Sequence, residues 1–154
     1  MMVSPQECAH DVLETVPLIM RTIRTEMRNQ RDADLTVPEF RTLTFIARHE
    51  DASPSQVAEH LGLTLPSMTH LVDGLVERGL VVRQPHHRDR RRLILSLTPL
   101  GDSTVQMARA AAQAALANKL TGLSTAQLET VTQAMRILRP IFTSSQAAQT
   151  IMEM

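Results

Sequence analysis

The sequence RGLVVRQPHHRDRRR, which runs from Arg78 to Arg92, contains six arginines and two histidines around a single acidic residue, Asp89. Residues 80–82, before its charged centre, and residues 93–97, after it, are rich in the aliphatic side chains that strands favour. In the second run every other residue is a leucine, which is typical of a strand with one buried side: Leu93, Leu95 and Leu97. This pattern predicts a two-stranded ribbon with a cationic tip.

The residues directly upstream, 53–79, predict two short helices joined at Gly62. Ser53 can cap the first helix, with a proline in its first position and Gln56 reaching back to the cap. Thr64 can cap the second helix, in which Pro66 is tolerated because it lies in the first turn. A helix-turn-helix followed by a basic ribbon is a winged helix, a shape that binds DNA.

The second of these helices has an apolar side and a polar side. The apolar stripe, which we expect to face the core, consists of Met68, Leu71, Val72, Leu75 and Val76. The outward side carries Pro66, Ser67, Thr69, His70 and Asp73. Small polar groups at the start of such a helix can approach base edges in the major groove. An ordinary amphipathic surface helix fits this segment alone equally well, and the neighbouring ribbon favours a recognition helix.

The positive charge of the chain is concentrated at the ribbon tip. Sixteen Lys+Arg balance sixteen Asp+Glu, and every cation except Lys119 is an arginine, which can bind phosphates and guanine edges bidentately. Charge runs are often only solvated loops, but a hairpin beside a helix-turn-helix argues against that interpretation here. Three Phe with no Trp or Tyr do not suit a protein that stacks single-stranded bases, so duplex DNA is the expected partner.

Other classes of function find little support in the sequence. It contains no Gly-rich phosphate loop, GxSxG elbow or HExxH motif, so we predict no enzyme, no catalytic residues and no cofactor. A single cysteine, Cys8, excludes an intrachain disulfide. His86 and His87 are adjacent and are expected to project to opposite sides of a strand, so no metal site is predicted.

Location follows from two further absences in the sequence. The N-terminus lacks a secretion signal, and no apolar stretch approaches the roughly 18 residues that cross a bilayer. We therefore expect a soluble, cytoplasmic protein with no membrane partner.

Helical patterns flank the winged helix on both sides. Residues 4–30 carry apolar side chains every three to four positions, residues 98–121 are alanine-rich, and Ser124 can cap a last helix. Thr36 and Glu39 form a capping box that opens the helix before Ser53.

The predicted fold is therefore mainly α with a small β-wing (α+β), in three parts. An N-terminal dimerisation helix occupies residues 1–34, a winged helix-turn-helix DNA-binding domain residues 35–98, and C-terminal dimerisation helices residues 99–154. Outside the winged helix each helix has an apolar stripe that needs a cover, and a second copy of the chain is the simplest one. A two-fold homodimer would also place two recognition helices about 34 Å apart on one face of a palindromic site.

Two segments resemble MarR-family transcriptional regulators. DRRRLILSLTPLG, from Asp89 to Gly101, is similar to their wing and following helix start, with the pattern Asp-x-Arg, an alternating strand and Leu-Thr-x-x-Gly. LVDGLVERGLVVR, from Leu71 to Arg83, resembles the end of their recognition helix and their first wing strand. The resemblance extends from about Val12 to Phe142. It implies a homodimer with interlocked terminal helices that binds pseudo-palindromic promoter DNA, usually as a repressor.

The same resemblance implies roles for the wing residues. Asp89 braces Arg91, and an arginine at the tip, Arg88 or Arg90, enters a minor groove whose narrowness attracts it. We expect phosphate contacts from Arg78, Arg83 and Arg92. Many family members have an arginine where this chain has His70. The predicted DNA-binding residues are Ser55, Gln56, Thr64, Pro66, Ser67, Thr69, His70, Arg78, Arg83, His87, Arg88, Asp89, Arg90, Arg91 and Arg92.

Regulation is the least specified part of the resemblance. Similar regulators release DNA when a small phenolic or lipophilic anion enters a crevice beside the dimer helices, and the sequence leaves its lining residues open. One branch senses hydroperoxides through a cysteine supported by tyrosines, which this chain lacks, so we expect Cys8 to be a buried, inert thiol. The remaining alternatives are a regulator that senses redox state through Cys8 and a winged helix that docks another protein. Steep salt dependence and a preference for a two-fold operator would distinguish DNA binding from protein docking.

Overall fold

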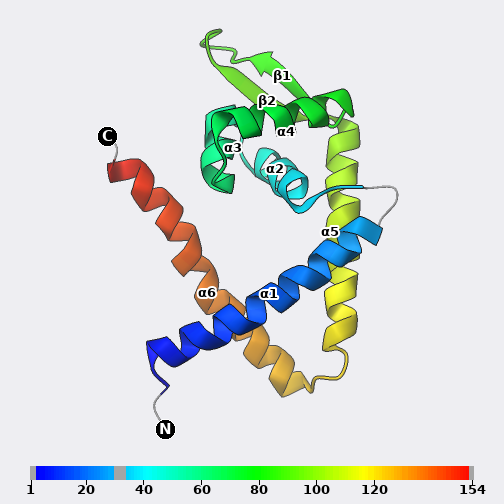
Figure 1. Cartoon of the computed structure of the whole chain (residues 1–154), viewed down its shortest axis with the longest axis vertical. Coiled ribbons are helices and arrows are strands. Elements are labelled where there is room, and N and C mark those ends of the chain that lie inside the picture. Colours follow the sequence, from blue (N-terminus) through cyan, green and yellow to red (C-terminus); the bar gives the residue numbers. More distant parts are fainter. Residues whose placement is uncertain (1–2, 30–33, 153–154) are drawn as a thin grey trace. The chain divides into compact units, whose positions relative to one another are not determined.

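The computed structural model describes residues 3–29 and 34–152, and side chains as far as Phe142. The described helices and strands follow the order expected of a winged helix with helical extensions (Figure 1). They are α1 (Pro5–Asn29), α2 (Val37–Arg48), α3 (Pro54–Leu61), α4 (Leu65–Glu77), β1 (Val81–Pro85), β2 (Leu93–Leu97), α5 (Pro99–Leu120) and α6 (Thr125–Met152). The predicted fold class, mainly α with a small β-wing, is confirmed. Gln30, where the sequence pattern ends the first helix, lies outside the described residues.

The chain divides into two compact units, residues 1–116 and residues 117–154, with the boundary inside α5. The first unit contains the winged helix together with α1 and most of α5, and the second contains the end of α5 and all of α6. The finer division at residues 34 and 98 stays a prediction.

The helix starts in the winged helix lie where the capping residues predict them. In α2, Thr36 accepts a hydrogen bond from the Glu39 amide at 3.3 Å, and the Glu39 carboxylate accepts one from the Thr36 amide at 2.7 Å. Ser53 and Gln56 exchange the same pair of bonds at the start of α3, at 3.2 Å and 2.9 Å. Gly62 ends α3 with φ 68°, a left-handed conformation that favours glycine.

The wing is an antiparallel pair in which Val81 faces Leu97 and Pro85 faces Leu93. The first strand begins one residue later than predicted and extends to Pro85. Leu80 is not part of it because its amide donates to the Leu75 carbonyl at 2.9 Å and closes the end of α4. The aliphatic run therefore marks the buried start of β1, and its polar half continues toward the tip.

The burial of β2 departs from simple alternation. Leu95 is buried as predicted, but Ile94 is also buried, with 6% of its surface exposed, and Leu93 is 47% exposed. The strand has neighbours beyond β1, because the Leu95 amide donates to the Ala52 carbonyl at 2.8 Å and both α2 and α3 contact β2. Both faces of β2 are therefore covered near this point, while Leu93 lies at the open end of the ribbon.

The core of the first unit joins side chains from α1 to α5 around the recognition helix. Its largest fully buried members are Met27, Leu43, Val57, Met68, Val72, Leu75, Val81, Leu95 and Val105. The predicted apolar stripe of the second short helix is confirmed: Met68, Val72 and Leu75 are buried, and Leu71 and Val76 pack partly buried against them. This packing fixes which face of α4 is left for solvent.

The helices outside the winged helix leave much of their apolar surface uncovered in the single chain. Of α1, only Met27 is buried, and Leu13, Val16, Leu18 and Ile19 are exposed. In α6, no side chain from Thr125 to Phe142 is buried. No described helix is both long enough and apolar enough to span a membrane.

Candidate nucleic-acid interface

The polar side of α4 faces solvent, as the sequence predicts. Thr64, Pro66, Ser67, Thr69 and His70 are all exposed. Thr64 caps the helix by accepting a hydrogen bond from the Ser67 amide at 3.3 Å, and its hydroxyl donates to that of Ser67 at 3.0 Å. The first two turns of α4 therefore present short hydroxyl and imidazole side chains to solvent, while the buried Met68 packs into the core on the opposite side.

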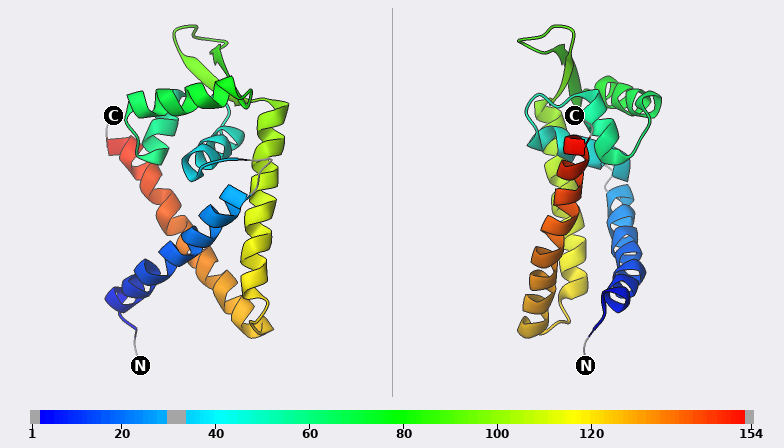
Figure 2. Two further views of the ribbon diagram at one scale, coloured as in Figure 1. Left: turned by 45° about the vertical axis from the view of Figure 1, so that its right-hand side comes forward. Right: turned by 90° about the vertical axis from the view of Figure 1, so that its left-hand side faces the viewer.

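The wing tip presents the highest local concentration of positive charge in the chain. Arg88, Arg90, Arg91 and Arg92 are exposed, and within the described residues none of these four guanidinium groups forms an ion pair. The wing extends beyond α4 at the same end of the first unit (Figures 1 and 2). The four arginines are therefore available to a polyanion that reaches α4.

Asp89 organises the tip through the backbone. Its carboxylate accepts a hydrogen bond from the Arg91 amide at 3.1 Å, and its carbonyl accepts one from the Arg92 amide at 3.0 Å. The His86 amide donates to the Arg92 carbonyl at 2.8 Å and closes the loop. The expected brace between Asp89 and Arg91 thus reaches the Arg91 backbone, which leaves the guanidinium group to solvent.

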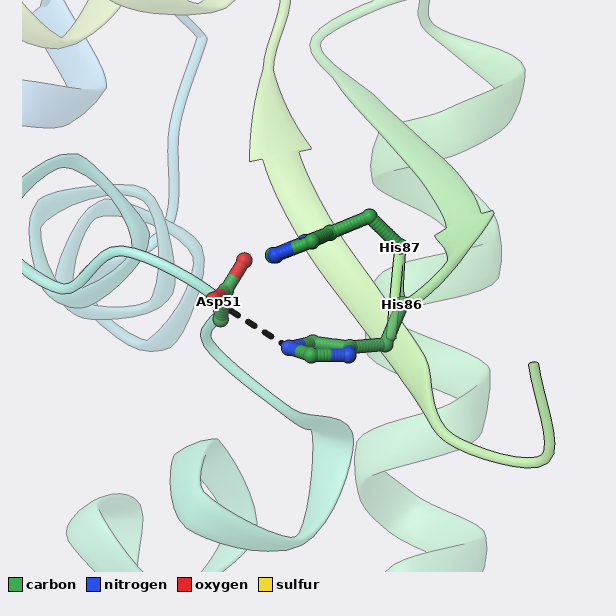
Figure 3. Close-up of side chains that lie close together, drawn as sticks. All are labelled: Asp51, His86 and His87. Atoms are coloured by element: carbon green, nitrogen blue, oxygen red, sulfur yellow. Dashed lines mark ion pairs between the residues drawn. The ribbon is translucent and has the colours of Figure 1, made fainter. Parts of the chain in front are cut away.

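His86 is a structural residue of the tip that the sequence interpretation missed. It is 8% exposed, and its Nδ1 accepts hydrogen bonds from the amides of Arg88 at 3.1 Å and Asp89 at 3.2 Å. Its Nε2 lies 3.3 Å from Oδ2 of Asp51, in the turn between α2 and α3 (Figure 3). One imidazole therefore shapes the tip and attaches it to the helical domain.

The expectation that His86 and His87 project to opposite sides of a strand is wrong. Their rings stack, with centroids 4.4 Å apart and an angle of 27° between the planes. Alternation applies only inside a strand, and β1 ends at Pro85. His87, one of the predicted DNA-binding residues, is exposed, and its ring lies over that of His86 (Figure 3).

Two arginines predicted to contact phosphates are bound to acidic partners in the free chain. Arg83 of β1 forms an ion pair with Asp73 of α4, which links the wing to the recognition helix. Arg78 donates to the Glu39 carboxylate at 3.2 Å and to the Asp34 carbonyl at 3.0 Å. Both contacts position elements of the interface, and the phosphate contacts of these two arginines stay predictions.

Ser55 and Gln56 lie in the first turn of α3 and are exposed. The side-chain oxygen of Gln56, Oε1, is used in the cap of α3, where it accepts a hydrogen bond from the Ser53 amide. The side-chain nitrogen of Gln56, Nε2, and the Ser55 hydroxyl are the groups that this helix start offers to a ligand.

Comparison with known proteins shows what this chain resembles. A model of the MarR family matches residues 33–92, from before α2 to the end of the wing tip. The HTH-type transcriptional repressor MdtR of Bacillus subtilis is 26% identical over 150 residues, which cover 97% of this chain and 93% of MdtR. The chain is similar to the MarR family along its winged helix. MarR-family relatives are transcriptional regulators rather than enzymes, and this chain is a DNA-binding regulator.

Solved structures share the MarR-family fold along most of the chain. FabT of Streptococcus pneumoniae, solved in complex with DNA, has a TM-score of 0.71 and 21% identity, and the match covers 92% of this chain and 99% of FabT. CouR of Rhodococcus jostii RHA1, solved bound to p-coumaroyl-CoA, has a TM-score of 0.66 and 22% identity, with 86% of this chain and 91% of CouR covered. At these identities the likeness concerns the fold.

Proposed function

We propose that the chain is a homodimeric repressor that binds a pseudo-palindromic operator with α4 in the major groove and the wing tip in the adjacent minor groove. The observation that carries the proposal is the pairing of an exposed polar face on α4 with four wing arginines that form no ion pair with any residue the structure describes. The Arg83–Asp73 ion pair links the two elements, so they are presented to DNA together. MdtR, which resembles this chain along most of its length, is a repressor by name.

The repressor is tested by footprinting the protein on the intergenic DNA beside its own gene. We expect protection of two half-sites about one helical turn apart, since a two-fold dimer presents two copies of α4. Transcription from the protected promoter should fall when the protein is added. Binding without preference among duplexes, or activation of that promoter, would contradict the proposal.

A homodimer is supported by the apolar surface that the single chain leaves exposed. Leu128, Val131, Met135, Ile141 and Phe142 of α6 are each 39% to 66% exposed. Exposed apolar side chains along one helix are typical of an interaction surface, and a second copy would remove them from water. The dimer also accounts for the exposed half of α1.

Introducing a charge on α6 will separate the dimer. Met135→Glu places a carboxylate in the proposed interface, where losing water is costly for an unpaired charge. We expect sedimentation to show at least about a tenfold weaker dimer, roughly 1.4 kcal/mol, and a parallel loss of operator affinity. Gln133→Glu, an exposed polar position on the same helix, adds the same charge and should leave both unchanged. Equal behaviour of the two variants would contradict this interface.

Release by an anionic effector is supported by a hollow of about 440 Å³ between the end of α1 and the start of α2. Its floor is apolar, and its rim carries three arginines of α1: Arg21, Arg24 and Arg28. Such a lining suits an aromatic or acyl group that ends in an anion. CouR was solved with p-coumaroyl-CoA, a ligand of that type.

Arg24→Ala will make release harder without affecting the unliganded repressor. A charge-assisted hydrogen bond is worth about 1.5–3 kcal/mol when desolvated, and at this open rim we expect the lower end, about a tenfold shift. The measurement is the concentration of p-coumarate or its CoA thioester that dissociates half of the operator complex. Arg136→Ala on α6 is the control and should leave that concentration unchanged. The same value for wild type and Arg24→Ala would exclude this hollow.

The redox alternative gains no support. Cys8 is exposed, which corrects the expectation that it is buried. Exposure alone does not activate a thiol, which needs a cationic or hydrogen-bonding environment.

A further inference from the structure

Asp51, His86 and His87, the last of which is also a predicted DNA-binding residue, form a cluster of side chains of the types that bind metals. Each offers one ligand atom, and these three atoms lie within 4.8 Å of one another. Asp51 comes from the turn between α2 and α3, whereas the two histidines follow β1 (Figure 3). The cluster is therefore assembled by the contact between the wing and the helical domain.

The ligand set suits a divalent transition metal. Two imidazoles and a carboxylate are typical zinc ligands, and bonds of about 2.0–2.1 Å in a tetrahedron place the ligand atoms roughly 3.4 Å apart. His86 Nε2 and Asp51 Oδ2 are already 3.3 Å apart. His87 is exposed, so its ring is free to complete the site by rotation. Asp51 and His87 also line an open hollow of about 750 Å³, which gives a metal ion access from solvent.

We propose that Asp51, His86 and His87 bind Zn²⁺ or a similar divalent transition metal, with water completing the coordination. Binding would fasten the turn before α3 to the base of the wing tip. A site with three protein ligands leaves the fourth position to water, whereas structural zinc sites usually have four protein ligands.

Metal binding at this site is coupled to the shape of the wing tip through the imidazole of His86. Its Nδ1 accepts two amide hydrogen bonds, so in the neutral ring the hydrogen is on Nε2 and points to Asp51. A metal on Nε2 displaces that hydrogen to Nδ1, where it faces the amide donors of Arg88 and Asp89. An N–H group on Nδ1 cannot accept a hydrogen bond from these amide N–H groups. The metal-bound state therefore requires the Arg88–Asp89 turn to move.

The regulatory consequence rests on the proposed function. If the wing tip contacts DNA, moving the turn displaces the arginines from the geometry that Asp89 and His86 maintain in the metal-free chain. We expect saturating Zn²⁺ to weaken operator binding about tenfold, because a displaced arginine loses its contact with the operator.

The site is tested on the full-length chain without a histidine tag. Titration with Co²⁺ should produce the visible absorption of a tetrahedral ion, and Zn²⁺ should displace it. Asp51→Asn and His87→Gln should each weaken Co²⁺ binding at least about tenfold. Asp51 has φ 56°, a conformation that asparagine tolerates, so Asp51→Asn should preserve the turn. His10→Gln, which removes an exposed histidine of α1, is the control and should bind Co²⁺ as the wild type does.

Each outcome bears on a separate part of the proposal. Equal Co²⁺ affinity in the wild type, Asp51→Asn and His87→Gln would overturn the site and leave adventitious binding by surface histidines. Normal Co²⁺ binding with no effect of Zn²⁺ on operator affinity would overturn the coupling to the tip. A chain that binds Co²⁺ at this site but never binds DNA would refute the repressor, while the metal site would stand.

Discussion

Replacing Arg90 and Arg91 together with alanine will abolish specific operator binding. Both side chains are exposed and form no ion pair within the described residues. Removing them therefore breaks no contact that holds the wing in its fold. An arginine contact to a base edge or phosphate is worth about 1–3 kcal/mol, and a dimer carries two wings. We expect a loss of at least about 100-fold in a gel shift, together with a shallower dependence of affinity on salt.

The control removes the same charge elsewhere. Arg48→Ala with Arg136→Ala deletes two exposed arginines, one at the end of α2 and one on α6, and changes the net charge equally. This pair should lower affinity only slightly, through the general field of the protein. Sedimentation should show dimers for both double variants. An unchanged gel shift for the wing variant, or an equal loss for both, would show that the tip does not contact the operator.

The sequence predicted most reliably the features that depend on residues close together along the chain. The caps of α2, α3 and α4 each depend on a side chain and an amide three residues away, so Thr36, Ser53 and Thr64 could be identified without a fold. The same holds for the polar face of α4, because helical periodicity alone separates Thr69 and His70 from the buried stripe.

The pairings that assemble the interface could not be predicted in this way. Arg78 and Glu39 are 39 residues apart, and Arg83 and Asp73 lie on different elements, so neither contact leaves a local pattern. An arginine in a basic run was therefore assigned to phosphate, although a carboxylate in the same domain engages it. The prediction of which β2 side chains are buried failed for a related reason. Ile94 is buried on a strand that α2 and α3 contact, and the alternation of residues along β2 does not reveal that packing.

His86 shows why the tip itself was only half predicted. Its neighbours in sequence suggested a charged loop, but its side chain is buried and contacts Asp51, which lies in another loop. One signal was available: a histidine directly after a proline that ends a strand is positioned by a turn, where strand alternation no longer applies.

Gly101→Ala will destabilise the chain strongly, although alanine is the better helix former by about 1 kcal/mol. Gly101 lies in the first turn of α5, and a Cβ there would lie 2.0 Å from the Leu80 carbonyl oxygen. That carbonyl accepts the Thr98 amide at 3.1 Å, and the Thr98 hydroxyl donates to the Gly79 carbonyl at 2.6 Å. The Leu-Thr-x-x-Gly pattern therefore forms the contact between β2, α5 and the end of α4. The glycine is needed because the backbone of α5 lies directly against the backbone of Leu80.

Making room for the methyl group requires α5 to move away from Leu80, and overpacking of this kind costs about 1–3 kcal/mol or more. We expect a loss of about 2–3 kcal/mol in the free energy of unfolding and a fall in Tm of roughly 5–10 °C by calorimetry. Gly74→Ala is the matched control, because Gly74 is inside α4 and, apart from the adjacent helix backbone, no atom of the described residues lies within 4 Å of its added Cβ. It should stabilise the chain by up to about 1 kcal/mol, since only helix propensity changes. If Gly101→Ala also raised Tm, the close approach of α5 to Leu80 would not explain the glycine.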